Sequence, residues 1–131
     1  GVAFFSQDGH GIASLVAAGF KVAWVTANYG SVIEGRASKL GVHLVLCRIA
    51  DKEEAIGLAL ADWGLTWEQV CYVGDDLNDV PAMRRALLAV AVADATMPAK
   101  EVAHWVTSRP GGLGAAREVC DVLLTAKAAD E

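Results

Sequence analysis

The sequence predicts a three-layer α/β/α domain, in which one parallel β-sheet lies between two layers of helices. Short continuous apolar runs alternate with amphipathic stretches along the chain, and continuous apolar strands are typical of parallel sheets buried on both faces. The 131 residues suit a single domain, and 54% of them are hydrophobic, which is too many for a disordered chain. Since there is no internal repeat or low-complexity linker, we expect one domain over residues 1–131.

The expected strands are short apolar runs, each of which fits the usual length of a strand. In chain order they are Val2–Phe5, Lys21–Thr26, Val42–Cys47, Val70–Val73, Leu88–Val92 and a weak strand at Trp105–Thr107. The run Lys21–Thr26 is rich in β-branched and aromatic residues, which favour strands. These runs predict the central layer of the domain.

The expected helices lie between these runs. They are Gly11–Ala18, Ser31–Leu40, Asp51–Trp63, Val80–Ala86 and a last helix from Leu113 to about Leu124, with a further short element over Ala99–Ala103. Gly19, Gly41 and Gly64 each stand where a helix would stop. Pro81 suits a first helical turn, and the T-x-x-Q spacing at residues 66–69 predicts a capping box that opens a single helical turn.

Composition excludes several classes of function. The formal net charge is −5, whereas a nucleic-acid binder needs a clustered basic face. The longest uncharged apolar stretch, near Leu87–Ala93, is far shorter than the roughly 18 residues of a membrane span. Cys47, Cys71 and Cys120 form no C-x-x-C pair, so we expect buried thiols and a cytoplasmic location. The three histidines are scattered and there is no signal-peptide pattern.

Polar side chains follow several of the predicted strands. Thr26 ends one strand, residues 47–52 with their lysine follow the next, residues 74–79 follow the third, and Asp94 follows the fourth. Open parallel sheets bind ligands beyond the carboxyl ends of their strands. We therefore expect a hydroxyl, a lysine and a cluster of carboxylates to meet at one edge of the sheet.

The carboxylates of that edge are Asp75, Asp76 and Asp79. Oxygen ligands of this kind favour a hard cation, most plausibly Mg²⁺, which usually takes only one or two carboxylates. The alternative is a plain turn, because Asp and Asn are common turn residues. Three carboxylates within five residues repel one another, and a cation would relieve that repulsion, which favours the metal slightly.

The other polar candidates are weaker when each is taken alone. Thr26 is a donor to a phosphate oxygen or an ordinary cap or turn residue. Lys52 opens a helix, where its charge opposes the helix dipole unless a phosphate or a neighbouring acid offsets it. Arg36 and Lys39 are three residues apart and share a helix face, either as a solvated basic face or as contacts to an acidic substrate.

Taken together, Thr26, Lys52 and the segment Gly74–Asp79 resemble motifs two, three and four of the haloacid dehalogenase superfamily. Four stretches resemble the 3-deoxy-D-manno-octulosonate 8-phosphate phosphatase family, whose domain also occurs at the C-terminus of some acylneuraminate cytidylyltransferases. These are Phe4–Ile12, YVGDDLNDVPAM at Tyr72–Met83, Ala91–Ala95 and the tail HWVTSRPGGLGAAREVCDVLL. The resemblance implies a Rossmann-like sheet without a separate cap domain, and a Mg²⁺-dependent phosphatase that acts on a phosphorylated sugar acid.

The resemblance also implies roles for individual residues. In the family an Asp nucleophile forms an aspartyl-phosphate, a second Asp acts as general acid and base, and Mg²⁺ and a lysine neutralise the phosphoryl group. Thr26 matches the phosphate-binding hydroxyl, Lys52 the lysine and Asp75 the metal ligand. Asp76 and Asp79 match acids that position the metal, its waters or the lysine.

Three further residues lie at positions that the family pattern assigns to substrate binding, and one of them, Asn28, departs from that pattern. Arg36 lies in the family's R-A-x-x-L-G segment, here RASKLG, and is a candidate for holding the sugar carboxylate, with Lys39 assisting. Asn28 stands where many relatives have arginine, which removes a cation near the substrate. The resemblance implies an octulosonate 8-phosphate as the default substrate. The change at Asn28 and the added cation of Lys39 make a nonulosonate 9-phosphate the competitor. The resemblance further implies a homotetramer.

The family's D-x-D nucleophile motif is absent from these 131 residues. One interpretation is that the chain lacks the N-terminal nucleophile strand and flap hairpin. In the other, Val2–Phe5 takes the central place, Ser6 replaces the nucleophile, and the domain is a catalytically silent binding or oligomerisation module. A sheet without its central strand would leave backbone groups unpaired at about 1–3 kcal/mol each, which favours the first. Whether this chain alone is an enzyme stays open.

Overall fold

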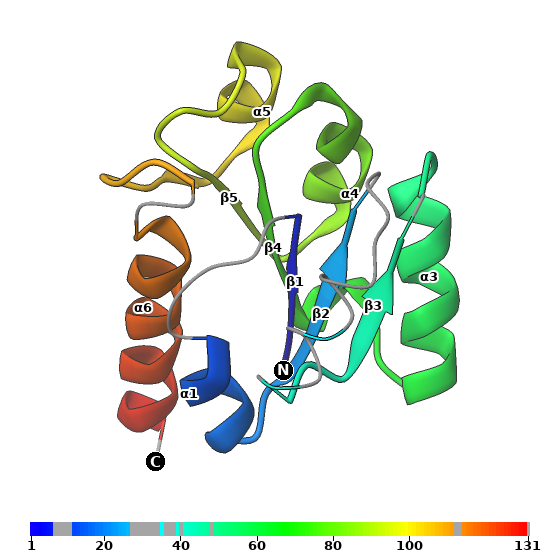
Figure 1. Ribbon diagram of the computed structural model, residues 1–131, viewed down its shortest axis with the longest axis vertical. Coiled ribbons are helices and arrows are strands. Elements are labelled where there is room, and N and C mark those ends of the chain that lie inside the picture. The colour runs from blue at the N-terminus through cyan, green and yellow to red at the C-terminus, as the bar shows by residue number, and fades with distance from the viewer. Residues whose placement is uncertain are drawn as a thin grey trace.

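The strands of the computed structural model form one parallel sheet (Figure 1). The structure describes residues 1–6, 12–26, 35, 39, 41–47, 49–111 and 114–130. In these residues the sheet has six strands in the order β3-β2-β1-β4-β5-β6. Their bounds are β1 Val2–Phe5, β2 Lys21–Val25, β3 Leu44–Leu46, β4 Val70–Gly74, β5 Leu88–Ala91 and β6 Trp105–Val106.

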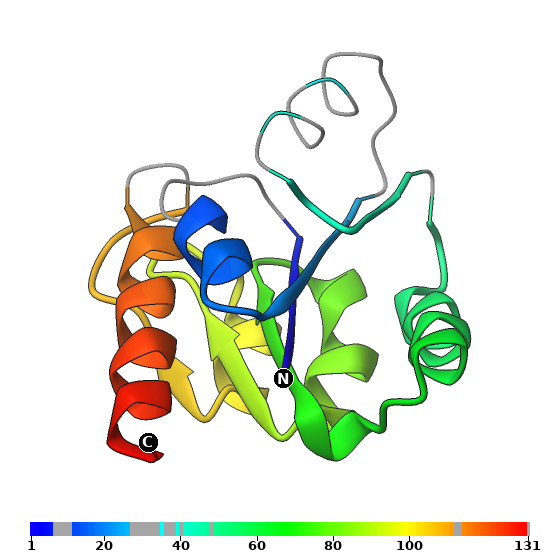
Figure 2. The ribbon, with the colours of Figure 1, turned by 90° about the horizontal axis from the view of Figure 1, so that it is seen from below.

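Helices cover both faces of this sheet, as Figures 1 and 2 show. The described helices are α1 Ile12–Ala17, α3 Lys52–Trp63, α4 Val80–Arg85, α5 Met97–Val102 and α6 Ala115–Asp130, with the 3₁₀ turns η1 Trp67–Gln69 and η2 Leu77–Asp79. Helices α1 and α6 pack together on one face, and α3 and α4 lie on the other. The ring of Phe4 in β1 lies 6.2 Å from that of Trp63 in α3. The predicted three-layer α/β/α architecture is therefore confirmed.

The first strand lies at the centre of the sheet. In β1, Phe5 pairs with Trp24 of β2 on one side and with Val73 of β4 on the other. All four residues of β1 are buried. Val2–Phe5 thus takes the central position that the favoured interpretation of the sequence had left without a strand. The cost of unpaired backbone groups, which supported that interpretation, also explains why this run fills the position. Backbone groups of β2 and β4 would stay unpaired without a strand between them, and this apolar run satisfies them.

Local sequence signals place several boundaries correctly. The side chain of Asp51 accepts a hydrogen bond from Glu54 N at 3.0 Å, and α3 begins at the next residue. Gly64 ends that helix in the left-handed conformation, with φ at 67°. In the predicted turn after it, Gln69 Oε1 accepts a hydrogen bond from Thr66 N at 3.0 Å. Helix capping therefore explains where α3 and η1 begin and end.

Other elements differ from the sequence prediction. Helix α6 continues to Asp130, beyond the expected end near Leu124. The last turns gain a tertiary contact, because Lys127 Nζ lies 5.6 Å from the centre of the Phe20 ring and also donates to the carbonyl of Ala18. The 3₁₀ turn η2 agrees with the alternative interpretation of the aspartates as a turn, although no helical turn was predicted there. The predicted helix Ser31–Leu40 lies outside the described residues except for positions 35 and 39, which are helical.

The cysteines carry free thiols. Cys71 and Cys120 are buried as expected, whereas Cys47 is half-buried. Burial raises the pKa of the Cys71 thiol to about 12, with a further contribution from Cys120. Burial likewise raises the pKa of the Cys120 thiol to about 12, so both thiols stay protonated at neutral pH. In the part of the chain that the structure describes, no helix has the length and apolar character needed to cross a membrane.

Candidate active site at the carboxyl edge of the sheet

Three polar residues follow three neighbouring strands at the carboxyl edge of the sheet. Thr26 follows β2, Ser6 follows the central β1, and Asp75 follows β4. Ser6 N donates to the carbonyl of Val73 at 3.0 Å, and Ser6 Oγ donates to Asp75 Oδ1 at 3.2 Å. Thr26 N donates to the carbonyl of Leu46 in β3 at 2.8 Å. The carboxyl ends of β1 and β4 therefore place the Ser6 hydroxyl on the Asp75 carboxylate.

Lys52 joins this edge from the start of α3. Its side chain is only 4% exposed, and its Nζ lies 2.7 Å from Asp79 Oδ1. A cation in the first turn of a helix opposes the helix dipole, and the sequence argument required an acid or a phosphate to offset that cost. Asp79 is that acid. Lys52 therefore points toward the turn that carries Asp75, as the predicted site requires.

Asp79 is the buried centre of this arrangement, with no exposed surface. Its Oδ1 accepts hydrogen bonds from Lys52 Nζ and from the hydroxyl of Tyr72. Its Oδ2 accepts from Asp75 N at 2.9 Å and from Asp76 N at 3.1 Å. A carboxylate offers about four acceptor positions, and these donors use all of them. Asp79 therefore positions the lysine and the turn.

The ionisation states follow from the same contacts. Burial alone would raise the pKa of the Asp79 carboxyl, but the charge and hydrogen bond of Lys52 outweigh it. The hydrogen bonds from Tyr72 and from the backbone of Asp75 act in the same direction, so the pKa is lowered and the group is ionised. Burial, followed by the charge of Asp79, raises the pKa of the Tyr72 phenol well above its ordinary value. Tyr72 is therefore a hydrogen-bond donor at any physiological pH.

The turn after β4 folds back because of two local features. Asp76 Oδ1 accepts from Leu77 N at 2.6 Å and so opens η2, which returns Asp79 beneath the strand end. A Cβ at Gly74 would lie 2.8 Å from Asp79 Cβ, so only glycine leaves room for this return. Asp76 and Asp79 thus also serve the turn, which was the alternative interpretation of the aspartates. The charge of Lys52 relieves the repulsion at Asp79.

Of the remaining predicted residues, Asn28 and Arg36 lie outside the described residues, and Lys39 is exposed. Among the described residues there is no group of three or more His, Cys, Asp or Glu side chains that could hold a metal ion. Asp75 and Asp76 are therefore the candidate carboxylates at this edge, and Asp76 is exposed.

Sequence reasoning did not assign a role to Tyr72. A signal was nevertheless present, because a tyrosine within an otherwise apolar buried strand needs a partner for its hydroxyl. The strand β4 is VCYVG, and all of its residues are buried. The partner, Asp79, stands seven residues later. The sequence spacing alone does not reveal that η2 brings the two side chains together.

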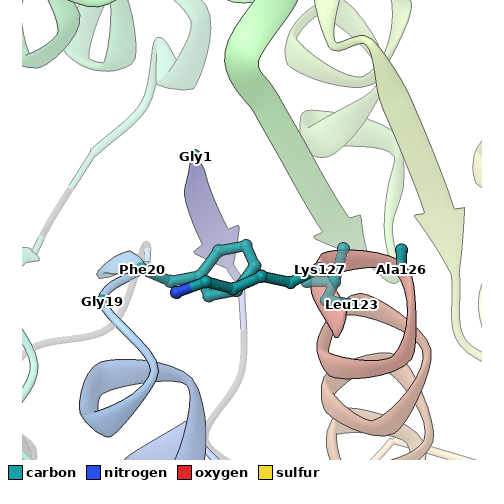
Figure 3. A pocket seen from close by; sticks show the side chains of 6 residues that line it. All are labelled: Gly1, Gly19, Phe20, Leu123, Ala126 and Lys127. Atoms are coloured by element: carbon teal, nitrogen blue, oxygen red, sulfur yellow. The ribbon is translucent and has the colours of Figure 1, made fainter. Parts of the chain in front are cut away.

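A separate cavity of about 340 Å³ lies at the opposite, amino-terminal edge of the sheet (Figure 3). It is lined by Gly1, Gly19, Phe20, Leu123, Ala126 and Lys127. Figure 3 shows the Lys127 side chain extending across the Phe20 ring. None of the residues of the candidate active site lines this cavity, so the two are distinct.

Known protein families and relatives match most of this chain. Residues 20–115 match the family of haloacid dehalogenase-like hydrolases. The chain belongs to this family. The 3-deoxy-D-manno-octulosonate 8-phosphate phosphatase from Yersinia pestis is 42% identical over 125 residues, which make up 95% of this chain and 67% of that relative. The chain thus spans about two thirds of the length of that relative.

Solved structures of this haloacid dehalogenase-like group show the same fold. A protein from Pseudomonas syringae described as a probable YrbI family phosphatase has a TM-score of 0.91 and 34% identity, over 95% of this chain and 84% of that one. A 3-deoxy-D-manno-octulosonate 8-phosphate phosphatase from Moraxella catarrhalis has a TM-score of 0.90 and 26% identity, over 95% and 85% of the two chains. That protein was crystallised with a magnesium ion, a phosphate ion and a KDO molecule. The family resemblance seen in the sequence is confirmed.

Proposed function

We propose that this haloacid dehalogenase-like domain is a Mg²⁺-dependent phosphatase domain acting on a phosphorylated sugar acid, with 3-deoxy-D-manno-octulosonate 8-phosphate as the first candidate. The observation that carries the proposal is the buried ammonium of Lys52. An ammonium has three N–H donors, and within the described residues one of them has an acceptor, Asp79 Oδ1. Buried charges need partners, so the two remaining donors favour an anion at this edge.

The neighbouring groups suit a phosphate monoester. Thr26 follows β2 and Ser6 follows β1, which lies between β2 and β4. A threonine hydroxyl can donate to a phosphate oxygen, whereas the Ser6 hydroxyl donates to Asp75. The positive charge of Lys52 lowers the energy of a phosphoryl group that gains negative charge as its ester bond breaks. These residues of the chain would therefore bind and orient the phosphate.

Magnesium fits the donors available beside this position. Asp75 and Asp76 supply carboxylate oxygens and Ser6 supplies a hydroxyl, and Mg²⁺ is bound by one or two carboxylates with water and phosphate oxygens completing its shell. When bound there, the ion would neutralise charge on the phosphate oxygens. Asp79 would act indirectly, because its four acceptor positions are already used.

A second candidate function is supported by the residue that follows the central strand. Among the described residues this position holds the Ser6 hydroxyl, which donates to Asp75, where the family resemblance implies a nucleophilic carboxylate. A serine hydroxyl is a weak nucleophile unless a base activates it. The alternative proposal is therefore a domain that binds phosphate and Mg²⁺ without turnover.

Phosphate release from 4-nitrophenyl phosphate and from the two sugar-acid phosphates, measured with Mg²⁺, distinguishes these candidates. We expect release, and we expect Asp75→Asn to reduce it by roughly 10²–10³-fold, the usual effect of removing an electrostatic contribution to catalysis. Leu58→Ala is the matched control, because Leu58 is 64% exposed on α3, and it should leave the rate unchanged.

The other outcomes of this assay are equally informative. Absence of release, together with phosphate binding that Asp75→Asn removes, would support the second candidate. Absence of both release and phosphate binding would contradict both. Faster release from a nonulosonate 9-phosphate than from 3-deoxy-D-manno-octulosonate 8-phosphate would reverse the order of the two substrates.

The assembly and location belong to the same proposal. The family resemblance supports a homotetramer, and the free thiols fit a reducing compartment such as the cytoplasm. Light scattering on the purified chain should give about four times the 13.7 kDa of one chain. A mass equal to one chain would contradict the tetramer without affecting the proposed chemistry.

A further inference from the structure

Tyr72 places a hydroxyl in the apolar interior of the sheet. It is the third residue of β4, and its side chain has no exposed surface. The hydroxyl donates to Asp79 Oδ1, the same oxygen that accepts from Lys52. A phenylalanine would fill nearly the same volume without a polar group, so packing alone does not explain the hydroxyl.

The contact divides the donors of Asp79 into two pairs. One pair, Tyr72 and Lys52, binds Oδ1, and the other pair, the backbone N–H groups of Asp75 and Asp76, binds Oδ2. The first pair includes the Lys52 ammonium itself. The second pair holds the turn that carries the candidate metal ligands. Tyr72 therefore acts on the lysine side of the carboxylate.

We propose that Tyr72 is a positioning residue of this site: its hydroxyl holds Oδ1 of Asp79 and shares its negative charge, so that Lys52 keeps donors for an anion. This inference rests on the proposed function, and it assigns a role to a residue that would not touch the substrate. Hydrogen bonds to an ionised acceptor are among the stronger ones in proteins. Removing this one leaves Oδ1 with Lys52 as its remaining described donor.

Loss of the Tyr72 hydroxyl should weaken binding of the anion more than binding of the metal. An under-satisfied buried oxygen attracts the Lys52 ammonium more strongly, which withdraws its N–H groups from a phosphate. The hydrogen bonds from Asp75 N and Asp76 N to Oδ2 do not involve the tyrosine. The turn that carries Asp75 and Asp76 therefore keeps its shape.

The test uses Tyr72→Phe in the full chain, with inorganic phosphate and MgCl₂ as the probes in separate calorimetric titrations. We expect phosphate affinity to fall roughly tenfold, equivalent to about 1.4 kcal/mol, with Mg²⁺ affinity unchanged. Val70→Ala is the matched control, because Val70 is a buried residue of the same strand whose side chain is apolar. It should lower stability while leaving phosphate affinity unchanged.

Each outcome decides one question. Unchanged phosphate affinity in Tyr72→Phe would overturn the role of the hydroxyl while leaving the proposed function standing. An equal loss of phosphate and Mg²⁺ affinity would indicate a purely structural role and would also overturn it. A wild-type chain that binds neither probe would instead contradict the proposed function. If Tyr72→Phe does not fold, Tyr72→Met removes the same hydroxyl with a flexible side chain and is judged by the same criteria.

Discussion

Replacing Lys52 with methionine is expected to lower the free energy of unfolding by about 3–5 kcal/mol at pH 7, because it leaves an ionised carboxylate buried without its counter-ion. Lys52 is 4% exposed and Asp79 is 0% exposed, with 2.7 Å between their charged atoms. Methionine keeps most of the apolar stem of lysine and removes only the ammonium. Phosphate binding should be lost together with the stability, because the same nitrogen serves both.

The pH dependence of this effect follows from the lowered pKa of Asp79. In the wild type the folded-state pKa lies below the unfolded value of about 3.9. The contribution of the pair is therefore complete above pH 4 and is lost as the pH falls through the lowered pKa. In Lys52→Met the ammonium no longer lowers the pKa of Asp79, so this pKa is higher than in the wild type. The variant then loses less stability than the wild type on acidification, so the difference between the two proteins should narrow below about pH 4.

Urea unfolding of both proteins at pH 7, 4 and 3 measures this difference. Glu53→Gln is the control, since Glu53 is the next residue of α3 and its pair with Arg85 of α4 joins side chains that are 38% and 54% exposed. Exposed pairs contribute only about 0.2–1 kcal/mol. The interpretation of a buried, functional ion pair would be contradicted if Lys52→Met cost no more than this control, or if its deficit were the same at every pH.

The convergence of the site could be predicted from the sequence because it follows from topology. The carboxyl ends of parallel strands meet at one edge of the sheet, so residues that follow the apolar runs, such as Thr26 and Asp75, must lie near one another. Helix α3 was equally predictable, because Asp51 and Gly64 supply strong local signals at its two ends. These inferences need only short-range patterns and the general rules of α/β folds.

The inner contacts of the site could not be predicted in this way. The contact between Ser6 and Asp75 joins residues 69 positions apart, and it depends on which apolar run takes the centre of the sheet. The partners of Asp79 depend on η2, whose fold-back is set by side-chain geometry that spacing does not show. The aspartates therefore allowed either a metal cluster or a turn, and the structure shows that Asp79 pairs with a lysine.

Replacing Gly74, the last residue of β4, with alanine should disturb the contacts of Asp79. A Cβ at this position would lie 2.8 Å from Asp79 Cβ, 3.0 Å from Asp79 Cγ and 3.0 Å from Met83 Sδ. Met83 has a flexible side chain that can move away. Asp79 cannot move without losing hydrogen bonds, because both of its oxygens are held by two donors each. We therefore expect a loss of about 1–3 kcal/mol in unfolding free energy, typical of overpacking.

The displacement of Asp79 should also carry Lys52 and the Asp75 turn with it, so that both phosphate and Mg²⁺ affinity fall. This separates Gly74→Ala from Tyr72→Phe, which should weaken phosphate binding alone. Gly57→Ala is the matched control, because Gly57 lies within α3 and an added Cβ there meets no atom within 4 Å. Alanine should stabilise that helix by about 0.5–1 kcal/mol. If Gly74→Ala instead matched the wild type in stability and in binding, Asp79 would not be held in place by its four donors, and the account of the site built on that anchoring would fail.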